Sequence, residues 1–505
     1  MTSKLEPVQE QLNDSFTFYR EIREQIIDGN TEKIKETIKE IEEQLNSGVE
    51  FSSDKRFFML STVAKHFQKV SNYDKAGNYG RQAIRLSKKV STEFIEVIID
   101  TYLDYASLER EYGQLSNARM ELAKLLAFLD TIDYKEPYAY GVIFSNLGKI
   151  ALDEENMESG LTQLEKSLNY FKKAVSETHP IISSSIKTLS DAYIQVEHYH
   201  KAVELYQELL ENYREAKHKV AEARTMLRLG EIHFYIDLKE ARKIITNAIK
   251  LMSEIYKGNH LDIANAILML AEIDENMSNF PRAINYYKQA LQQLTHFYDE
   301  THFLVVYVYS KIGTISIKTF KLNQAKEYLE KGLDLSTQFP KIRMQFLYAL
   351  GKIYSDEKAY DEAFEVFKEF LQRLEQDGRK KSIAYGNTLQ AIAFNYLEQE
   401  LMEEALVYYR NALGIYESLS NCKEEMGLTY IRLAYCYENI EDKDHQQAES
   451  NYEKGFKIIE KSRNQELLEE ALAGIIDFFT RNENAKKRRL YEDKFVKLQS
   501  QKNKA

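Results

Sequence analysis

The sequence predicts an all-α solenoid of ten to eleven helical hairpins, because one helix-turn-helix pattern recurs along most of its 505 residues. The clearest copy lies in residues 346–374, where Leu350 and Gly351 share one helical face and Ala363 and Phe367 share another. A small residue at the crossing of two helices allows the helix axes to approach closely. Gly351 and Ala363 are therefore interpreted as the two register marks of one hairpin.

Both register marks recur with a regular spacing. The first mark is small in all eleven copies, which are Ala64, Ala106, Gly148, Ser190, Gly230, Ala271, Gly313, Gly351, Ala393, Ala434 and Gly474. Successive copies are 38 to 42 residues apart. The second mark follows eleven to fourteen residues later, and its copies are Ala76, Ala118, Gly160, Ala202, Ala241, Ala283, Ala325, Ala363, Ala405, Ala448 and Ala485. This rhythm predicts a repeat architecture in which each hairpin packs mainly on its neighbours.

The pattern resembles the tetratricopeptide family, in which a Leu-Gly or Leu-Ala pair is followed by an aromatic residue, an alanine and a second aromatic residue. Here Leu350, Gly351, Tyr354, Ala363 and Phe367 carry it. The period of about 42 residues exceeds the usual 34 and resembles the long-repeat variant of kinesin light chains. The resemblance covers roughly residues 55–480 and implies a right-handed α-α superhelix.

Three linkers support that variant, because each opens a first helix as the Asp-His-Pro linkers of kinesin light chains do. They are Glu177-Thr178-His179-Pro180, Gly258-Asn259-His260 and Glu300-Thr301-His302.

The chain begins with residues 1–14, which are polar and lack periodicity, so we expect a mobile tail there. Residues 15–50 carry two short apolar stripes, typified by Tyr19 and Ile22 and by Ile38 and Ile41. We interpret them as an N-terminal capping hairpin, because the end of an array must cover its first exposed face. A coiled-coil segment like that of kinesin light chains is the alternative.

Residues 51–480 form the expected repeat array. Its outer helical faces are rich in charge, as at Lys326 and Glu330, and we expect these side chains to be solvated. Two irregularities interrupt the rhythm: a 38-residue step that contains Phe339 and Pro340, and an insertion at residues 441–444. Both are expected to alter the geometry of the superhelix locally.

Residues 481–505 are expected to form a basic C-terminal capping helix or tail. They hold nine Lys or Arg residues against three Asp or Glu residues, and the basic run is Lys486, Lys487, Arg488 and Arg489. Such a run is usually a solvated helix face. The alternatives are a nuclear signal or a contact with an acidic surface such as tubulin or RNA.

The net charge, the cysteine count and the length of the apolar runs indicate which partners and which cellular compartment to expect. The net charge of −11 disfavours nucleic acid as a partner of the whole surface. Two cysteines, Cys422 and Cys436, cannot build a disulfide framework, and no leader pattern precedes the array. The longest apolar run, residues 303–309, is seven residues long, whereas a membrane-spanning helix needs about 20. We therefore expect a soluble cytoplasmic protein with no membrane segment.

The sequence lacks the usual signatures of catalysis. It contains no glycine-rich phosphate loop, no zinc-protease motif and no nucleophile elbow. His198 and His200 form the only close histidine pair, and too few further ligands lie nearby to hold a metal. We therefore expect neither an enzyme nor a bound cofactor or metal.

The resemblance implies that partners bind in a concave groove lined by first-helix residues next to the small mark. In the C-terminal repeats these groove positions are Tyr348, Lys352, Phe394, Leu397, Ile431 and Tyr435. An exposed apolar and aromatic strip of this kind indicates a binding site. The alternative is that the same residues pack against neighbouring helices.

This sequence lacks the residues by which two known groups of the family bind their partners. The Lys and Asn set that holds a chaperone's terminal carboxylate is not repeated, since Lys187 stands beside Asp191 and Asn146 is alone. The asparagine ladder of kinesin light chains is also missing.

The predicted function is a non-catalytic scaffold or adaptor that binds partner proteins or peptides within a larger complex, for example a cytoskeletal or ciliary assembly. The alternative is a ligand- or peptide-gated regulator whose superhelix compacts on binding.

Overall fold

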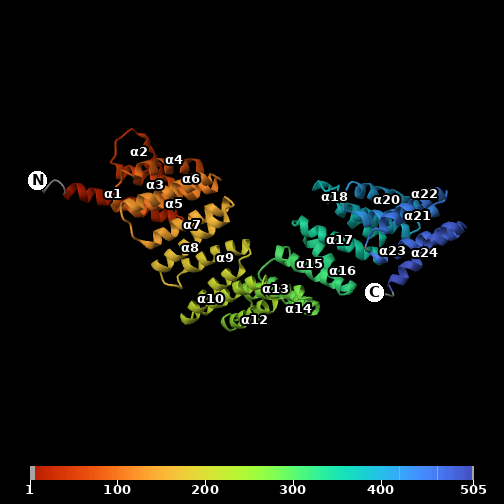
Figure 1. Ribbon diagram of the computed structural model, residues 1–505. Helices are drawn as coiled ribbons and strands as arrows, with labels where there is room; N and C mark the ends of the chain where they lie inside the picture. Colours follow the sequence, from red (N-terminus) through yellow and green to blue (C-terminus); the bar gives the residue numbers. More distant parts are fainter. Residues whose placement is uncertain (1–5, 420, 463, 503–505) are drawn as a thin grey trace. The chain divides into compact units, whose positions relative to one another are not determined.

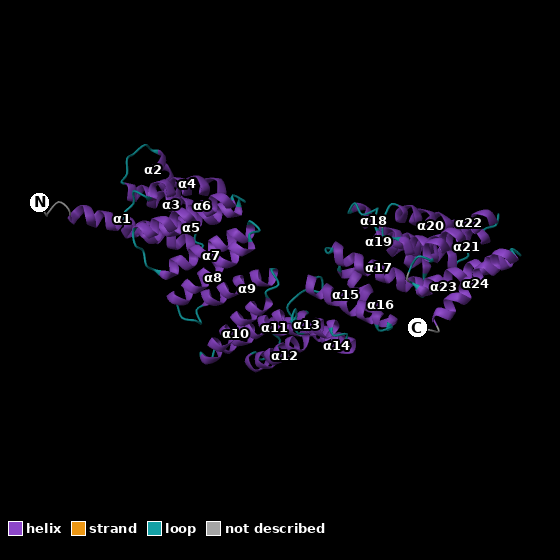
Figure 2. Ribbon diagram, in the orientation of Figure 1, coloured by secondary structure: helices purple, strands orange, loops and turns teal. Residues whose placement is uncertain are grey.

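The computed structural model describes residues 6–419, 421–462 and 464–502, and in these ranges the secondary structure is helical with no strand (Figures 1 and 2). The helices are α1 (Glu6–Ile27), α2 (Lys35–Asn46), α3 (Ser53–Lys69), α4 (Tyr73–Ser87), α5 (Ile95–Glu111), α6 (Leu115–Thr131), α7 (Pro137–Asp153), α8 (Met157–Ala174), α9 (Pro180–Gln195), α10 (Tyr199–Glu215), α11 (Lys219–His233), α12 (Leu238–Ile255), α13 (Leu261–Asn276), α14 (Phe280–Leu294), α15 (Phe303–Lys318), α16 (Leu322–Leu335), α17 (Pro340–Asp356), α18 (Tyr360–Gln376), α19 (Ile383–Glu398), α20 (Met402–Glu417), α21 (Lys423–Asn439), α22 (His445–Ile459), α23 (Gln465–Arg481) and α24 (Ala485–Lys502). A short 3-10 helix, η1 (Thr92–Phe94), precedes α5.

The helices from α3 to α24 pair in sequence order as eleven hairpins, each with a first and a second helix that pack together. The prediction of an all-α solenoid of ten to eleven hairpins is therefore confirmed. No helix within the described ranges is both long enough and apolar enough to cross a bilayer.

The small register marks lie where the two helices of a hairpin cross. Gly351 of α17 is buried, and a Cβ added there would lie 2.7 Å from Cδ1 of Phe367 on α18. A Cβ at Gly148 of α7 would lie 2.7 Å from Cγ of Leu164 on α8. Any larger residue would therefore force the helices apart. The second marks from Ala76 to Ala448 are all buried as well.

A left-handed backbone residue ends the first helix at a constant offset from both marks. In eight hairpins a residue with a φ of 55° to 73° lies seven residues after the first mark and five before the second, and these residues are Ser71, Gly113, Glu155, Glu197, Ser278, Phe320, Lys358 and Glu400. This conformation terminates a helix by satisfying its last carbonyls. In the first hairpin, for example, the amide of Asn72 donates to the carbonyl of Phe67 at 2.8 Å.

The eleventh hairpin departs from the predicted marks. Its left-handed turn residue is Glu483, with a φ of 55°, and the residues at the offsets that the marks have in the other hairpins are Ile476 and Arg488. Gly474 is only half-buried, and a Cβ there would meet nothing closer than 3.4 Å. Ala485 is exposed. The prediction of Gly474 and Ala485 as marks is wrong, because a small residue in the sequence does not by itself reveal the turn that sets the crossing.

Histidines cap the helices that follow the three predicted linkers. Nδ1 of His179, His260 and His302 accepts a hydrogen bond from the backbone amide two residues later, at 3.1 to 3.2 Å. The imidazoles of His260 and His302 also stack on the rings of Tyr256 and Tyr298, with centroids 3.5 and 3.7 Å apart. A side-chain acceptor at this position satisfies an amide that the helix itself leaves without a partner.

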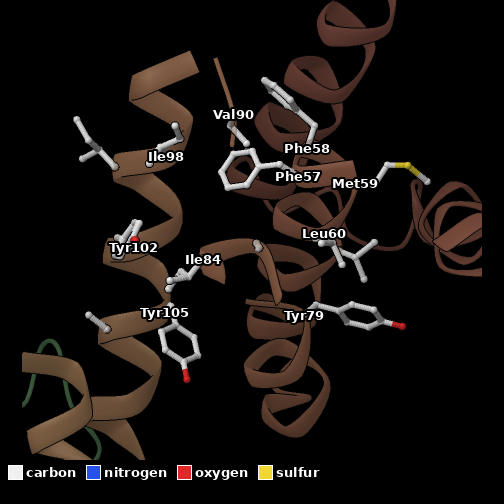
Figure 3. Packing of buried hydrophobic residues seen from close by; sticks show 14 of the residues in the cluster. Phe57, Phe58, Met59, Leu60, Tyr79, Ile84, Val90, Ile98, Tyr102 and Tyr105 are labelled. Atoms are coloured by element: carbon white, nitrogen blue, oxygen red, sulfur yellow. The ribbon is translucent and has the colours of Figure 1, made fainter. Parts of the chain in front are cut away.

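Helices α1 and α2 cover the exposed face of α3 at the start of the array. Residues such as Ile26 of α1 and Ile38 of α2 join the same buried cluster as Phe57 and Ile98, and Figure 3 shows part of this cluster. Helix α1 begins at Glu6, well before the expected end of the tail at residue 14. Helix-favouring residues follow a proline in its first turn, where proline is tolerated. Residues 1–5 of the expected tail lie outside the described residues.

The chain divides into two compact units, Met1–Ile255 (unit 1) and Tyr256–Ala505 (unit 2). Inside unit 2, side chains expected to be solvated instead link neighbouring hairpins. Lys326 of α16 binds Glu357 at 2.7 Å, and Glu330 of the same helix accepts a hydrogen bond from Tyr354 of α17 at 2.7 Å. Both contacts contribute to the stacking of consecutive hairpins.

Candidate functional site

The predicted groove positions lie on three consecutive first helices of unit 2, α17, α19 and α21 (Figure 1). The structure separates them into an exposed pair, two half-buried residues, one exposed cation and one core residue. Phe394 of α19 and Tyr435 of α21 are each 40% exposed. Both stand one residue after the first mark of their hairpin, so they occupy the same register position.

Cationic side chains accompany the aromatic groove positions. The guanidinium of Arg432 lies 5.7 Å from the ring centroid of Phe394 and also binds Glu470 of α23 at 2.6 Å. The ammonium of Lys352 lies 4.7 Å from the ring centroid of Tyr348. A cation over an aromatic face is held by the ring quadrupole, so these contacts orient the rings.

Ile431 is a core residue rather than a groove residue. It is 6% exposed and packs in the cluster around Tyr452 and Phe456 of α22. A Cβ added to Gly455 of α22 would lie 2.9 Å from Cδ1 of Ile431, which shows how closely the helices approach here. Its assignment to the groove is therefore corrected.

Tyr348 and Leu397 are half-buried, as the alternative interpretation of the strip expects. The ring of Tyr348 packs against Phe370 of α18, with centroids 5.4 Å apart. Leu397 packs against the cluster that contains Ala405 and Leu406 of α20. Both residues contribute mainly to hairpin packing, and Phe394 and Tyr435 remain as the exposed part of the strip.

Two residues of the basic run of α24 form ion pairs inside unit 2. Lys487 binds Glu449 and Glu453 of α22, the latter at 2.7 Å, and these carboxylates raise the pKa of Lys487. Nε of Arg488 lies 3.3 Å from Glu492 on the same helix. Lys486 and Arg489 are exposed, so they are the members of the run with free access to a partner.

The histidine pair lies at the start of α10, and the two cysteines lie in unit 2. His198 is the exposed N-cap of α10, and no cluster of three potential metal ligands occurs among the described residues. Cys422 and Cys436 are both fully buried, and burial raises the pKa of Cys436 to about 12. A thiol with so high a pKa is a poor nucleophile at neutral pH.

A cavity that the sequence did not reveal lies in unit 1 and is lined by residues of the first helices α9 and α11 and of the second helix α10. Its volume is about 860 Å³. Some consecutive first helices, such as α3 and α5 or α15 and α17, pack against each other, whereas those from α7 to α15 do so less. Here the N-terminal halves of α9 and α11 instead flank open space.

The cavity lining is strongly basic and contains no carboxylate. Five cationic side chains contribute to it, namely Lys187, Lys217, Lys219, Arg224 and Arg228, together with His218. Its remaining surface comes from hydroxyl groups such as those of Ser183 and Thr225 and from apolar groups such as Leu209 and Val220. In a chain with a net charge of −11, this concentration of positive charge is unusual.

The carboxylates near the cavity are engaged outside its lining. Asp191 of α9 accepts a hydrogen bond from Arg228 of α11 at 2.7 Å, and Glu231 also binds Arg228. Asp191, which stands one turn after Lys187 on α9, therefore joins two hairpins through Arg228. Glu222 binds Arg214 at 3.0 Å and Lys219 at 3.5 Å.

The groups around Arg228 keep its side chain protonated. Burial lowers the pKa of Arg228, but Tyr206, Glu231 and Asp191 outweigh burial and raise it overall. Burial also raises the pKa of Tyr206, so this phenol stays protonated at neutral pH. Arg228 therefore lines the cavity as a fixed cation.

Comparison with protein families matches tetratricopeptide repeat models to residues 140–215, 221–296, 306–339 and 345–373. No curated protein sequence matches the chain.

Several solved structures are similar in fold. A Podosopora anserina protein with nearly identical TPR-like repeats, named as a kinesin light chain, is similar in two structures. One structure is 14% identical over 39% of this chain and 95% of that chain, with a TM-score of 0.35, and the other is 15% identical. The apo quorum sensor NprR from B. thuringiensis is 16% identical over 71% of this chain and 97% of that chain, with a TM-score of 0.39. The apo form of RapI is 11% identical over 72% of this chain and 98% of that chain, with a TM-score of 0.49.

The matched segments span helices α7 to α18, and hairpins with the same register marks extend on both sides of them. The hairpins from α7 to α18 are therefore tetratricopeptide repeats, and hairpins with the same register marks recur along the chain at intervals of about 42 residues.

Proposed function

We propose that the chain is a non-catalytic scaffold that binds a protein or peptide partner through the first-helix face of unit 2. Tetratricopeptide repeats are in general a protein-interaction fold. The observation that carries the proposal is the exposed aromatic pair, Phe394 and Tyr435, at one register position of two consecutive hairpins. In unit 1 the same position holds small or charged residues such as Lys65, Ser107 and Asp191.

Exposed aromatic residues at equivalent positions suit an interface better than a free surface. Each of the two residues leaves 40% of its surface to water, and the exposure of its apolar part costs free energy unless a partner covers it. Large aromatics at the centre of an interface commonly contribute about 2 kcal/mol or more, which is roughly a thirtyfold change in affinity. The pair therefore supplies two anchor residues for an interface.

The double variant Phe394→Ala with Tyr435→Ala tests this proposal. We expect a partner that the wild-type chain recovers from native extract to be lost, while the melting temperature stays nearly unchanged because both rings are exposed. Val407→Ala is the matched control, since Val407 is 53% exposed on the second helix α20. Normal partner recovery together with a sharply lowered melting temperature would show that the rings are structural.

The narrower proposal places this scaffold in a larger cytoskeletal or ciliary assembly. The long charged helix faces and the 35 tyrosines of the chain suit repeated contacts with a large partner. Co-sedimentation with microtubules, compared between the wild-type chain and the double variant, tests it. Equal amounts of chain in the supernatant with and without microtubules would reject this location.

The cavity of unit 1 favours a second candidate function, a regulator whose superhelix compacts on binding a short ligand. The cavity has a volume of about 860 Å³, and a ligand bound in it would contact both α9 and α11. Small-angle scattering should then show a smaller radius of gyration when a short peptide is added. An unchanged radius of gyration at saturating peptide would contradict the regulator function and would not affect the scaffold proposal.

A further inference from the structure

We propose that helix α24 of one copy of the chain binds helix α1 of a second copy, so that the protein associates with itself head to tail. The proposal goes beyond the scaffold function and does not depend on the aromatic pair of unit 2. Three observations carry it. Each helix has an exposed face, the two faces carry opposite net charge, and each face exposes two large apolar side chains.

Helix α24 has a side that no other helix of the described ranges covers. Earlier second helices, such as α4, α10 and α20, pack both on their own first helix and on the first helix of the next hairpin. Helix α24 packs on α23 (Figure 1), and no further hairpin follows it in the described part of the chain. The side of α24 that corresponds to a junction between hairpins is therefore exposed.

The exposed residues of α24 form one stripe along the helix. Between residues 486 and 497 they are Lys486, Arg489, Leu490, Asp493, Val496 and Lys497. A spacing of three or four residues from turn to turn places them on one helical face. Leu490 and Val496 are 53% and 66% exposed. The stripe carries three cations and one carboxylate, a net charge of +2.

The three cations of this stripe are available to a partner, unlike their neighbours on the same helix. Lys487 and Lys494 bind carboxylates on and directly after α22. Lys486, Arg489 and Lys497 form no ion pair with any described residue. A partner can therefore contact them without breaking an ion pair inside unit 2.

The exposed side of α1 has the same composition with the opposite sign. Tyr19, Ile22 and Ile26 of α1 are buried in unit 1. The exposed residues between 18 and 28 are Phe18, Arg20, Glu21, Glu24, Gln25, Ile27 and Asp28. Phe18 and Ile27 are 45% and 55% exposed. This stripe carries three carboxylates and one cation, a net charge of −2, and none of the four forms an ion pair with a described residue.

The two stripes match in charge and in length. The α24 stripe from Lys486 to Lys497 rises about 16 Å, and the α1 stripe from Phe18 to Ile27 rises about 14 Å. Contact between two α24 helices, or between two α1 helices, would bring like charges together, which is unfavourable. The favoured contact joins different surfaces of two copies, so it either closes into a ring of copies or continues as an open chain.

The charged and the apolar residues of the stripes have different roles. Exposed charges attract the two stripes, but each pair gains little free energy because water and salt screen it. Burial of Leu490 and Val496 against Phe18 and Ile27 of the second copy removes apolar surface from water. We therefore expect a weak, salt-sensitive association rather than a permanent oligomer.

Sedimentation velocity of the full chain over a range of concentrations tests the proposal. At low salt we expect the weight-average sedimentation coefficient to rise with protein concentration. High salt should weaken this rise, because it screens the attraction between the stripes. A coefficient that does not rise with concentration at low salt would overturn the inference.

Paired charge reversals locate the contact. Glu21→Lys with Glu24→Lys makes the α1 stripe basic, and Lys486→Glu with Arg489→Glu makes the α24 stripe acidic. Each variant alone should associate about tenfold or more weakly than wild type, since attraction becomes repulsion. An equal mixture of the two variants should regain association, because the basic α1 of one variant meets the acidic α24 of the other. A mixture that stays monomeric, with both variants folded by circular dichroism, would contradict the proposed contact.

A matched reversal on another helix controls for net charge. Lys239 and Lys250 are both exposed on α12, so Lys239→Glu with Lys250→Glu changes the net charge by the same amount as the α24 reversal. This control should associate like wild type, and an equal weakening would show a general charge effect instead of a contact at α24. If the α1 reversal prevents folding, Glu21→Gln with Glu24→Gln removes the charges alone and should still weaken association.

Two exposed valines on second helices test the apolar part of the contact. Val496 of α24 is 66% exposed, and Val407 of α20 is 53% exposed. Val496→Ser should weaken association about threefold or more, whereas Val407→Ser should not. Equal effects would argue against a contact at α24. The Phe394→Ala with Tyr435→Ala variant should sediment like wild type, so failure of this proposal and failure of the scaffold proposal are distinguishable.

Labelled polyuridylic acid distinguishes a second copy from a nucleic acid as the partner of the basic stripe. We expect fluorescence anisotropy to show equally weak binding of this RNA by wild type and by the Lys486→Glu with Arg489→Glu variant. A chain that stays monomeric at every concentration, yet binds the RNA through Lys486 and Arg489, would assign the stripe to nucleic acid and overturn the inference.

Discussion

A matched pair of glycine substitutions gives the most direct test of the helix crossing. Gly313 of α15 is a buried register mark, and an added Cβ would lie 2.6 Å from Cγ of Leu329 on α16. Leu329 is only 1% exposed, so it cannot move aside without displacing its own neighbours. Gly414 of α20 is exposed, and an added Cβ there would meet nothing within 4 Å.

The same chemical change therefore has opposite expected effects at the two sites. Replacing a helical glycine by alanine stabilises by about 0.5–1 kcal/mol when space is available, as at Gly414. At Gly313 the same gain is opposed by overpacking, which costs about 1–3 kcal/mol. The difference between Gly313→Ala and Gly414→Ala isolates the overpacking, because the gain in helix propensity is common to both.

Urea unfolding followed by circular dichroism measures both variants. Repeat arrays can unfold in more than one step, so hydrogen exchange of the α15 and α16 amides should locate the change. We expect faster exchange in this hairpin for Gly313→Ala and no such change for Gly414→Ala. Equal or parallel shifts for the two variants would refute the assignment of Gly313 to a helix crossing.

Two further predictions concern buried polar residues at one register position, two residues after the first mark. Asn395 of α19 is 1% exposed, and neither its side-chain amide nitrogen nor its side-chain amide oxygen has a hydrogen-bond partner. Asn395→Leu should therefore raise the melting temperature, because it removes a cost of about 1–3 kcal/mol for burying an unsatisfied polar group. A lowered melting temperature would contradict this. His66 of α3 is 5% exposed, and burial lowers its pKa below the ordinary value of about 6.5. The stability that neutral His66 confers is therefore complete above that ordinary value and is lost as the pH falls through the lowered folded-state pKa. His66→Phe should lose less stability than wild type between neutral and acidic pH, and an equal loss in both proteins would assign the pH dependence to other groups.

The sequence was sufficient to predict the hairpins because one local pattern sets both the turn and the crossing. In eight hairpins, small marks such as Gly351 and Ala363 flank a left-handed turn residue such as Lys358 at constant offsets. Where glycine and alanine occur for other reasons, as at Gly474 and Ala485, the composition misleads. The turn conformation, rather than residue size, decides the register there.

The candidate sites were harder to predict because they depend on contacts between hairpins. Ile431 and Phe394 both lie on first helices near the mark, yet one is 6% and the other 40% exposed. Whether such a residue is covered depends on the local angle between consecutive hairpins. The unit 1 cavity has the same origin, since Lys187 and Arg228 are 41 residues apart in the chain. A dense group of cations between Arg214 and Arg228 was the available signal in the sequence.

The constant offsets within the hairpins also bear on how the length of such a chain can change. Eight hairpins keep an interval of twelve residues between their two register marks. Duplication or excision of one complete segment of about 42 residues would therefore leave every later turn in phase. The α11–α12 and α21–α22 hairpins, with intervals of eleven and fourteen residues, lack this interchangeability.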